Sequence, residues 1–483
     1  MFLKRFYDDG LAQASYLIGC AATGEAVVID ANRDIEQYLV AAAVEKLRIT
    51  HVTETHIHAD FVSGSRELVR ATGATLFLSA EGGTDWQYAF AKADGATLVR
   101  DGDVIKVGNI RLDVMHTPGH TPEHISFLVT DTAGADAPMG IATGDFVFVG
   151  DVGRPDLLER AAKVANTMEA GARTLFHSLE RFRALPDFVQ VWPGHGAGSA
   201  CGKSLGAVPT STVGYEKRFN WGVGTTSEAD FVEMVLAGQP EPPFYFAQMK
   251  RINTEGPRIL GGFPQPAHAA LGALQHALAG APSGRTAVVD TRASGAFAEG
   301  HIPGTINIPL NKSFSTWAGW LVAYDVDIQL IAEDHAAVQL AVRELAMIGL
   351  DRVTTWYAPA VLDEYQSAGH ELGVVAKIDS HALAPRLARG EVTVIDVRNR
   401  SEWDAGHLPG AMHIPVGYLP ERLADIPRDK PVVLHCQGGG RSAIAASLLQ
   451  NLGVAGATDL VGGLTAWEAA GHEVVRDHLP AEV

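Results

Sequence analysis

Thr55-His56-Ile57-His58-Ala59-Asp60-Phe61 brings two histidines and an aspartate together in the first half of this 483-residue chain. A β-branched run before it, residues 49–53, predicts a strand, and a helical pattern begins after it at Ser65. The two histidines and the aspartate are therefore expected on a loop at the end of a strand, where metal sites are commonly held. Imidazole and carboxylate ligands together suit zinc or non-haem iron.

Three further motifs follow this stretch in the chain. They are Thr117-Pro118-Gly119-His120-Thr121, Thr143-Gly144-Asp145 and Pro193-Gly194-His195-Gly196. In this order and spacing, the four motifs resemble the metallo-β-lactamase superfamily over roughly residues 1–250. The alternative is that they are loop histidines with no role as ligands. The resemblance implies an αββα sandwich with a metal site, which we place at residues 1–255.

Phe61 departs from the pattern of the dinuclear hydrolases in this superfamily, which carry a histidine at that position. Phenylalanine cannot ligate a metal, so the sequence predicts one metal per chain. Among single-metal members, the sequence resembles the persulfide dioxygenases most. That resemblance implies one Fe(II), held by His56, His120 and Asp145, with coordination positions left open for oxygen and substrate. Zinc is the alternative metal.

The same resemblance suggests roles for other polar residues of this half. Three of them would orient ligands or water, or would serve as alternative metal ligands: His58, Asp60 and His195. Arg154 matches an arginine that contacts the thiol carrier's carboxylate, and the alternative is a salt bridge to Asp151 or Asp156. Cys201 could hold or guide a persulfide, although a lone cysteine is more often an inert small hydrophobic residue.

The composition indicates a globular chain with a strong negative charge. Lys and Arg number 38 and Asp and Glu 56, so the net charge is −18, which argues against nucleic acid or an anionic membrane as a partner. No apolar run reaches the length of a membrane helix, and the first residues lack the apolar stretch of a signal peptide. The three cysteines are far apart, which favours the reducing cytoplasm.

The second half of the chain repeats itself after a predicted linker at residues 256–264. Val288-Val289-Asp290-Thr291-Arg292 matches Val394-Ile395-Asp396-Val397-Arg398, which follows it by 106 residues, and a Gly-His-x-Pro-Gly motif recurs at the same offset. Short apolar strands alternate with amphipathic helices, which predicts α/β domains with parallel sheets. Both copies resemble rhodanese domains, and we place them at residues 265–376 and 377–483.

The second copy carries the chemistry of that family. A buried-strand pattern runs into Cys436-Gln437-Gly438-Gly439-Gly440-Arg441-Ser442, and a helix follows. Backbone N–H groups, the helix N-terminus and Arg441 would form an anion cradle that stabilises a thiolate or persulfide. The arginine follows the cysteine by five residues, a shorter loop than in tyrosine phosphatases, as in sulfurtransferases. The alternative is a structural cysteine before an ordinary turn. Cys436 and Arg441 are thus the catalytic candidates, and the substrate-binding candidates are Gln437, Gly438, Gly439, Gly440 and Ser442.

The first copy has lost this loop. When Gly349 is aligned with Gly453, Ala332 stands where the second copy has Cys436, and Ala337 stands where it has Arg441. The residues between them are acidic. This copy is therefore predicted to be a catalytically silent rhodanese fold.

Together, the resemblances imply an enzyme of sulfide and persulfide metabolism. It would oxidise a small thiol persulfide, such as glutathione persulfide, with O2 to sulfite, and Cys436 would make or use thiosulfate. One alternative is a zinc-dependent thioester hydrolase of the glyoxalase II kind fused to a sulfurtransferase. Another is a sulfane-sulfur carrier or sensor. We further expect a homo-oligomer, a dimer or a tetramer, with neither nucleic acid nor a membrane as a partner.

Overall fold

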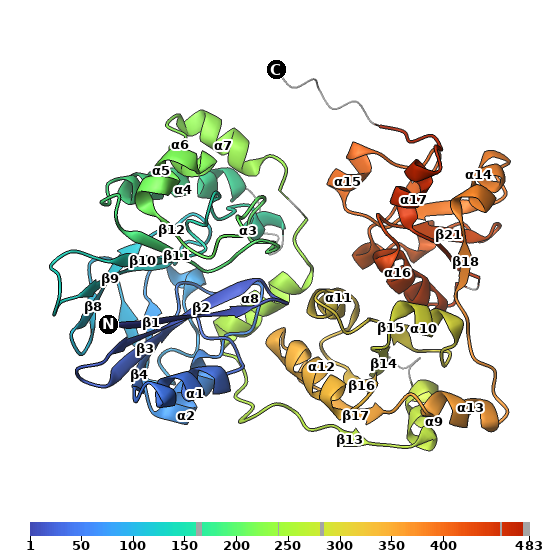
Figure 1. Cartoon of the computed structure of the whole chain (residues 1–483), viewed down its shortest axis with the longest axis horizontal. Helices are drawn as coiled ribbons and strands as arrows, with labels where there is room; N and C mark the ends of the chain where they lie inside the picture. Colours follow the sequence, from blue (N-terminus) through green and yellow to red (C-terminus); the bar gives the residue numbers. More distant parts are fainter. Residues whose placement is uncertain (161–166, 240, 281–284, 455, 477–483) are drawn as a thin grey trace. The chain divides into compact units, whose positions relative to one another are not determined.

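The computed structural model describes residues 1–160, 167–239, 241–280, 285–454 and 456–476 (Figure 1). The chain separates into two compact units. The first consists of Met1–Gly262 with Ala346–Gly349, and the second of Phe263–Leu345 with Leu350–Val483. Within the described residues, none of the helices has the length and apolar character needed to cross a membrane.

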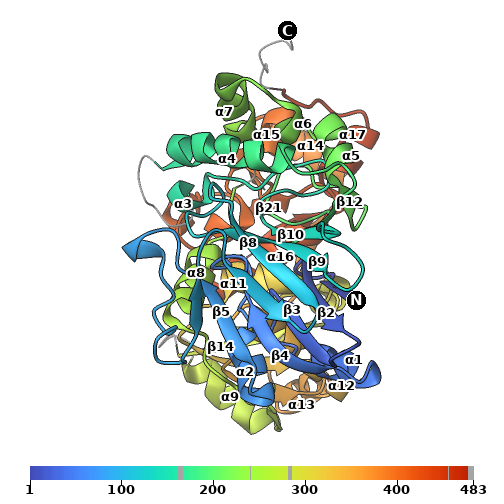
Figure 2. The same cartoon turned by 90° about the vertical axis from the view of Figure 1, so that its left-hand side faces the viewer.

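The first unit is built on two six-stranded sheets (Figure 2). One sheet has the order β1 (Phe2–Asp8), β2 (Gln13–Cys20), β3 (Glu25–Ile29), β4 (Arg48–Thr53), β5 (Thr75–Ser79) and β6 (Thr97–Val99). The other has the order β12 (Ser211–Thr212), β11 (Gln190–Pro193), β10 (Gly140–Gly144), β9 (Ile125–Asp131), β8 (Ile110–His116) and β7 (Val104–Val107).

Alternating side chains of β2 explain how the layers pack. Tyr16 and Ile18 belong to a core that also contains residues of the second sheet, such as Phe127 and Leu112. Leu17 points to the opposite face and joins the core under the helices. Because both faces of this strand are covered, it is buried throughout its length.

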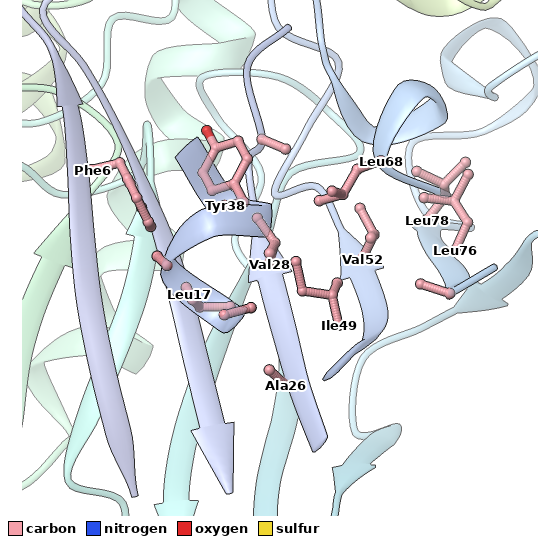
Figure 3. Close-up of a cluster of buried hydrophobic side chains, with 14 of the residues drawn as sticks. Phe6, Leu17, Ala26, Val28, Tyr38, Ile49, Val52, Leu68, Leu76 and Leu78 are labelled. Atoms are coloured by element: carbon pink, nitrogen blue, oxygen red, sulfur yellow. The ribbon is translucent and has the colours of Figure 1, made fainter. Parts of the chain in front are cut away.

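Helices cover the outer face of each sheet. The first sheet is covered by α1 (Glu36–Val44) and α2 (Ser65–Thr72), and Figure 3 shows Tyr38 and Leu68 beside sheet residues such as Val28 and Val52. The second sheet packs on α4 (Met168–Arg183), α5 (Val213–Phe219) and α7 (Glu228–Leu236). The remaining helices of this unit are α3 (Leu157–Arg160), α6 (Trp221–Gly224) and α8 (Tyr245–Glu255). The predicted αββα sandwich is confirmed.

The second unit contains two five-stranded parallel sheets with the same topology. The first has the order β13 (Ala267–His268), β17 (Val353–Tyr357), β16 (Asp327–Ile331), β14 (Thr286–Asp290) and β15 (Ile306–Asn307). The second has the order β18 (Ala376–Ile378), β22 (Thr458–Leu460), β21 (Val432–His435), β19 (Thr393–Asp396) and β20 (Met412–His413). The equal orders confirm the rhodanese-like α/β fold with parallel sheets. We call the domain built on the first of these sheets the middle domain and the domain built on the second the last domain.

Helices pack on both parallel sheets. In the middle domain they are α9 (Leu271–Gly280), α10 (Ser294–Glu299), α11 (Phe314–Leu321), α12 (His335–Met347) and α13 (Val361–Ser367). In the last domain they are α14 (Ser380–Ala388), α15 (Arg400–Ala405), α16 (Gly440–Asn451) and α17 (Gly463–Ala469).

The middle and last domains share a hydrophobic core inside the second unit. Phe297 and Ala298 of α10 are buried in the same cluster as Ile444 and Leu448 of α16. A hydrogen bond reinforces this contact, because the Asn307 backbone N–H donates to the Ser447 hydroxyl at 3.0 Å. One wall of the last domain is therefore made by the middle domain.

Candidate metal centre and sulfur-transfer loop

Three predicted ligands converge from loops that follow strands. His56 comes after β4, His120 after β8 and Asp145 directly after β10. All three are buried, and one ligand atom of each lies within 4.8 Å of the others. The Asp145 Oδ2 atom is 3.5 Å from His120 Nε2 and 3.9 Å from His56 Nε2.

In each of the two imidazoles, the Nδ1 atom forms a hydrogen bond with another group of the protein. His120 Nδ1–H donates to the Arg154 carbonyl oxygen at 3.0 Å. His56 Nδ1 lies 3.0 Å from the Thr55 hydroxyl, which itself donates to Asp30 and so accepts from the ring. Both Nε2 lone pairs are thereby left facing Asp145.

Several of the converging atoms lack a hydrogen-bond partner. In the described part of the chain this holds for His56 Nε2 and both carboxylate oxygens of Asp145, although all are buried. Buried polar atoms without partners are costly in a folded protein unless something else satisfies them. A divalent cation would satisfy these atoms, because imidazole nitrogens and carboxylate oxygens are common metal ligands in proteins. The geometry therefore supports a metal site.

A second group of potential ligands lies beside the first. His195 Nε2 is 3.1 Å from Asp60 Oδ2 and 3.4 Å from Asp145 Oδ1, while its Nδ1–H donates to the Ala12 carbonyl at 2.9 Å. The Cys201 sulfur also lies within 4.8 Å of ligand atoms of Asp60 and His195. The structure thus gathers these candidates around the loops that carry the first group.

His58 is turned toward a different carboxylate. Its Nε2 is 3.2 Å from Asp30 Oδ1, and its ring lies 4.4 Å from the ring of Phe61, between centroids. Phe61 is fully buried at the position where dinuclear members carry a histidine. Its side chain fills space there and offers no metal ligand.

Burial and charge set opposite protonation states within the site. Burial, helped by neighbouring imidazoles, holds the pKa of His56 well below its usual range. Burial also lowers the pKa of His120, against the opposing charge of Asp145. For His195, burial acts in the same direction, but Asp145 and its other acidic neighbours outweigh it and raise the pKa. His56 and His120 are therefore held in the neutral form that binds metals.

Arg154 and Cys201 lie in different surroundings. Arg154 is fully buried, donates to Asp156 at 2.8 and 2.7 Å, and donates to the Ala200 carbonyl at 3.0 Å. The salt bridge with Asp156 is thus present, and contact with a thiol carrier stays a prediction.

Cys201 faces Asp60 and His195, and burial raises the pKa of its thiol to about 12. A role in holding sulfur stays a prediction.

Two positioning residues of the metal site were missed from the sequence. Asp30 accepts hydrogen bonds from the Thr55 N–H and hydroxyl at 2.7 and 2.9 Å, and it adopts a positive φ of 55° at the end of β3. His124 Nε2 accepts from the Asp145 backbone N–H at 3.1 Å. An aspartate that ends a buried apolar run was the only signal for Asp30. His124 directly precedes β9, and its place four residues after His120 indicated only a packed or hydrogen-bonded histidine.

The predicted sulfur-transfer loop joins β21 to α16. The Gly439 backbone N–H donates to Cys436 Sγ at 3.1 Å, and the Ser442 hydroxyl lies 3.6 Å from the same sulfur. Gly439 has a φ of 103°, which favours glycine over residues with a Cβ. Gln437 Oε1 accepts from Arg398 at 3.1 Å. These contacts arrange N–H and O–H donors around a buried sulfur.

Arg441 has a partner that the sequence did not reveal. Its guanidinium binds the carboxylate of Glu402 in a bidentate ion pair, with N–O distances of 2.6 and 2.7 Å. The positive potential expected from Arg441 is therefore partly neutralised. The middle domain has Ala296 in place of Glu402 at the 106-residue offset and, when Gly349 is aligned with Gly453, Ala337 in place of Arg441, so both members of the pair are absent there.

In the middle domain, the loop that corresponds to the sulfur-transfer loop has a side chain bound to one of its helix N–H groups. Ala332 is buried after β16, and the Asp334 carboxylate accepts from the Ala337 N–H at 2.8 Å. Asp334 thus occupies a helix N–H that an anion would need. The geometry agrees with the absence of a nucleophile.

Comparisons with known proteins cover both units. A sequence profile of the metallo-beta-lactamase superfamily matches residues 8–195, and one of the rhodanese-like domain matches residues 380–470. A crystal structure of a metallo-beta-lactamase from Staphylococcus aureus subsp. aureus COL is 46% identical and covers 74% of this chain and 99% of its own, with a TM-score of 0.66.

Three curated relatives match parts of the chain. A hydroxyacylglutathione hydrolase of Polaromonas sp. is 35% identical over 38% of this chain, and the match spans only 61% of that relative's length. The persulfide dioxygenase of Bos taurus is 27% identical over 40% of this chain and 68% of its own. A sulfurtransferase of Allochromatium vinosum is 37% identical over 21% of this chain and 96% of its own. The chain therefore belongs to the metallo-β-lactamase superfamily and carries, later in the sequence, a rhodanese-like domain similar to the sulfurtransferases.

Proposed function

We propose that the metal centre oxidises a small thiol persulfide to sulfite and that Cys436 exchanges sulfane sulfur with thiosulfate. The observation that carries the first part is the buried set of His56, His120 and Asp145, with Phe61 in place of a further ligand. The similarity to a persulfide dioxygenase supports the same reading. Persulfide, dioxygen, sulfite and thiosulfate are the small molecules that this proposal requires.

Two histidines and one carboxylate form the ligand set of many non-haem iron oxygenases. Fe(II) held there would supply the activation of dioxygen that side chains alone cannot provide. The chain itself orients the imidazoles through Thr55 and the Arg154 carbonyl, and burial keeps bulk water away. Overall, one persulfide, one O2 and one water give one free thiol, one sulfite and two protons.

The sulfur-transfer loop supplies the second reaction. The Cys436 thiolate attacks the outer sulfur of thiosulfate, the sulfur–sulfur bond breaks, and sulfite leaves with the bonding electron pair. Cys436 then carries a persulfide, and the reverse reaction makes thiosulfate. The Gly439 N–H, 3.1 Å from Sγ, stabilises the anionic sulfur in either direction.

A zinc-dependent thioester hydrolase is the second candidate for the metal centre. The group formed by Asp60, His195 and Cys201 offers further ligand atoms, and a hydroxyacylglutathione hydrolase is among the relatives. Phe61 weighs against it, because a dinuclear site of that family lacks one ligand here.

Oxygen uptake distinguishes the two candidates. The protein, purified anaerobically with its metal content measured, is mixed with glutathione persulfide in an oxygen electrode, and sulfite is quantified. We expect one iron per chain and one sulfite for each O2 consumed. His120→Ala is the control and should abolish uptake. Hydrolysis of a hydroxyacylglutathione thioester without persulfide-dependent uptake would refute the proposal in favour of the hydrolase.

A further inference from the structure

A cavity of about 230 Å³ lies within the second unit, beside the sulfur-transfer loop. Its walls include Gly438 and Gly439 of that loop, and the middle domain contributes Phe297 of α10. The Gly439 N–H that faces Cys436 Sγ therefore belongs to a residue that also borders this cavity. The middle domain thus contributes to a cavity that borders the loop carrying Cys436.

Two side chains of opposite charge line this cavity. Lys377 of β18 and Asp459 of β22 are direct partners in the register of the parallel sheet, so they lie on one face of it. Within the described residues, no ion pair of 4.0 Å or less joins them, although the charge of Lys377 acts on the Asp459 carboxylate. Asp459 is only 7% exposed, and its Oδ1 atom is buried without a hydrogen-bond partner in the described structure. The Ser442 hydroxyl and the Lys377 ammonium both act on this carboxylate and favour its ionised form.

The silent middle domain provides an internal comparison. Its strands β13 and β17 pair His268 with Trp356 at the equivalent register position, and the two rings lie 4.4 Å apart between centroids. An aromatic pair thus replaces the charged pair where the cysteine is also missing. The charges are associated with the copy that can carry sulfur.

We propose that this cavity is the acceptor subsite of the sulfur-transfer loop and binds a small thiol bearing both an ammonium and a carboxylate group. The ammonium would bind the Asp459 carboxylate where it lines the cavity, and the carboxylate of the thiol would bind Lys377. Phe297 and Val375, which also line the cavity, would contact the methylene carbon of an amino-acid thiol such as cysteine. Burial raises the pKa of Asp459 to about 6, so its carboxylate is ionised at pH 7.5. The inference rests on the sulfurtransferase function proposed above.

The transfer itself needs no further reactant. The thiolate of the bound acceptor attacks the outer sulfur of the Cys436 persulfide, and the bond between that sulfur and Sγ breaks. The Cys436 thiolate leaves with the electron pair, and the proton lost by the acceptor thiol ends on the new persulfide. The product belongs to the class of compounds that the metal centre is proposed to oxidise.

Four thiols of similar size test this subsite in the full chain. Cysteine carries both charges, cysteamine only the ammonium, 3-mercaptopropionate only the carboxylate, and 2-mercaptoethanol neither. Cys436 is first loaded from thiosulfate, with released sulfite as the readout, and kcat/KM is then measured for each acceptor.

The variants are Lys377→Gln and Asp459→Asn, with Lys430→Gln as the matched control on an exposed lysine outside the cavity. Lys377→Gln should lower kcat/KM about tenfold for cysteine and 3-mercaptopropionate, because it removes one charge-assisted hydrogen bond. Asp459→Asn should do the same for cysteine and cysteamine. Values for 2-mercaptoethanol should not change.

The two proposals fail in different ways. A wild-type protein that releases no sulfite from thiosulfate refutes the sulfurtransferase function and, with it, the subsite. If sulfite is released but both variants keep the wild-type order and ratios of the four thiols, the subsite alone is refuted. Should Asp459→Asn misfold because its site is buried, Lys377→Gln on its exposed residue carries the test.

Discussion

Phe61 is the residue that we expect to set the number of metals. Its buried ring occupies the position of a missing ligand, next to Asp60. Phe61→His should raise zinc occupancy from about one toward two per chain, because it adds an imidazole directly after Asp60, whose carboxylate lies 3.1 Å from His195. Elemental analysis after zinc loading and gel filtration measures this, with Phe61→Leu as the control that should stay near one. A wild-type protein with two tightly bound metals would contradict the prediction.

Asp30 should matter for metal affinity although it is not among the proposed ligands. Its carboxylate accepts from both the N–H and the hydroxyl of Thr55, and that hydroxyl holds the His56 ring. Asp30→Asn replaces an acceptor with an amide, so metal affinity should fall about 10–100-fold. Competition with a chromophoric chelator gives the value. An unchanged affinity would show that Thr55 orients His56 without Asp30.

Cys201 should resist alkylation at neutral and mildly alkaline pH. Burial raises the pKa of its thiol to about 12, so the reactive thiolate is on the order of one part in ten thousand at pH 8. Its modification by iodoacetamide should rise as the pH increases toward that pKa. Peptide mass spectrometry measures the labelled fraction. Rapid labelling of Cys201 in the folded protein at pH 8 would disprove this assignment.

At this scale, the sequence predicted residues that lie in local motifs and missed those that act through tertiary contacts. His56, His120 and Asp145 were found because each sits in a short motif after a strand. Glu402 was missed, because nothing in the sequence indicates that the chain folds back to pair two charges that lie 39 positions apart. Burial of Arg154 in an ion pair was one of two alternatives, and only packing distinguishes them.

Among the elements, the repeated sheets were predictable and the helix boundaries were less so. The two copies share their strand order because the same apolar strands and motifs recur at one offset. Residues 157–180 have a helical pattern in the sequence; the structure has α3 and α4 there, with residues 161–166 outside the described residues, and α4 continues to Arg183. The hydrogen bond from the Ala337 N–H to Asp334 could not be predicted from the sequence, because a side-chain cap depends on the local backbone conformation.

The loop before α12 should stay inactive when only its cysteine is restored. Ala332→Cys places a thiol next to Asp334, whose carboxylate uses a helix N–H and adds negative charge. No thiocyanate should form from thiosulfate and cyanide in a Cys436→Ser background. Replacing residues 332–338 with Cys436–Ser442 should restore some turnover, since Asp290 and Arg292 still form their buried ion pair. Measurable turnover from Ala332→Cys alone would show that the acidic loop does not silence the domain.

For the whole molecule, we expect two centres that work independently on small substrates. Cys436→Ser should abolish transfer of sulfur from thiosulfate and leave oxygen uptake with a soluble persulfide within about twofold of wild type. His120→Ala should abolish uptake and retain the sulfur transfer. Parallel assays of both activities in both variants check this. Loss of oxygen uptake in Cys436→Ser would show instead that the persulfide must pass through the loop.

The core that the middle domain shares with the last domain also constrains how such chains can diverge. Glu333 and Asp334 in the loop before α12 are exposed, so substitutions there remove at most the hydrogen bond between Asp334 and the Ala337 N–H and leave the buried packing unchanged, which leaves this loop free to vary. Phe297 and Ala298 had no such freedom, because they are buried against α16 and a smaller or polar substitute would leave a void under the helix that presents Cys436. We therefore expect substitutions in chains related to this one to accumulate at residues 333–334 before they reach the buried contact that Phe297 and Ala298 make with α16.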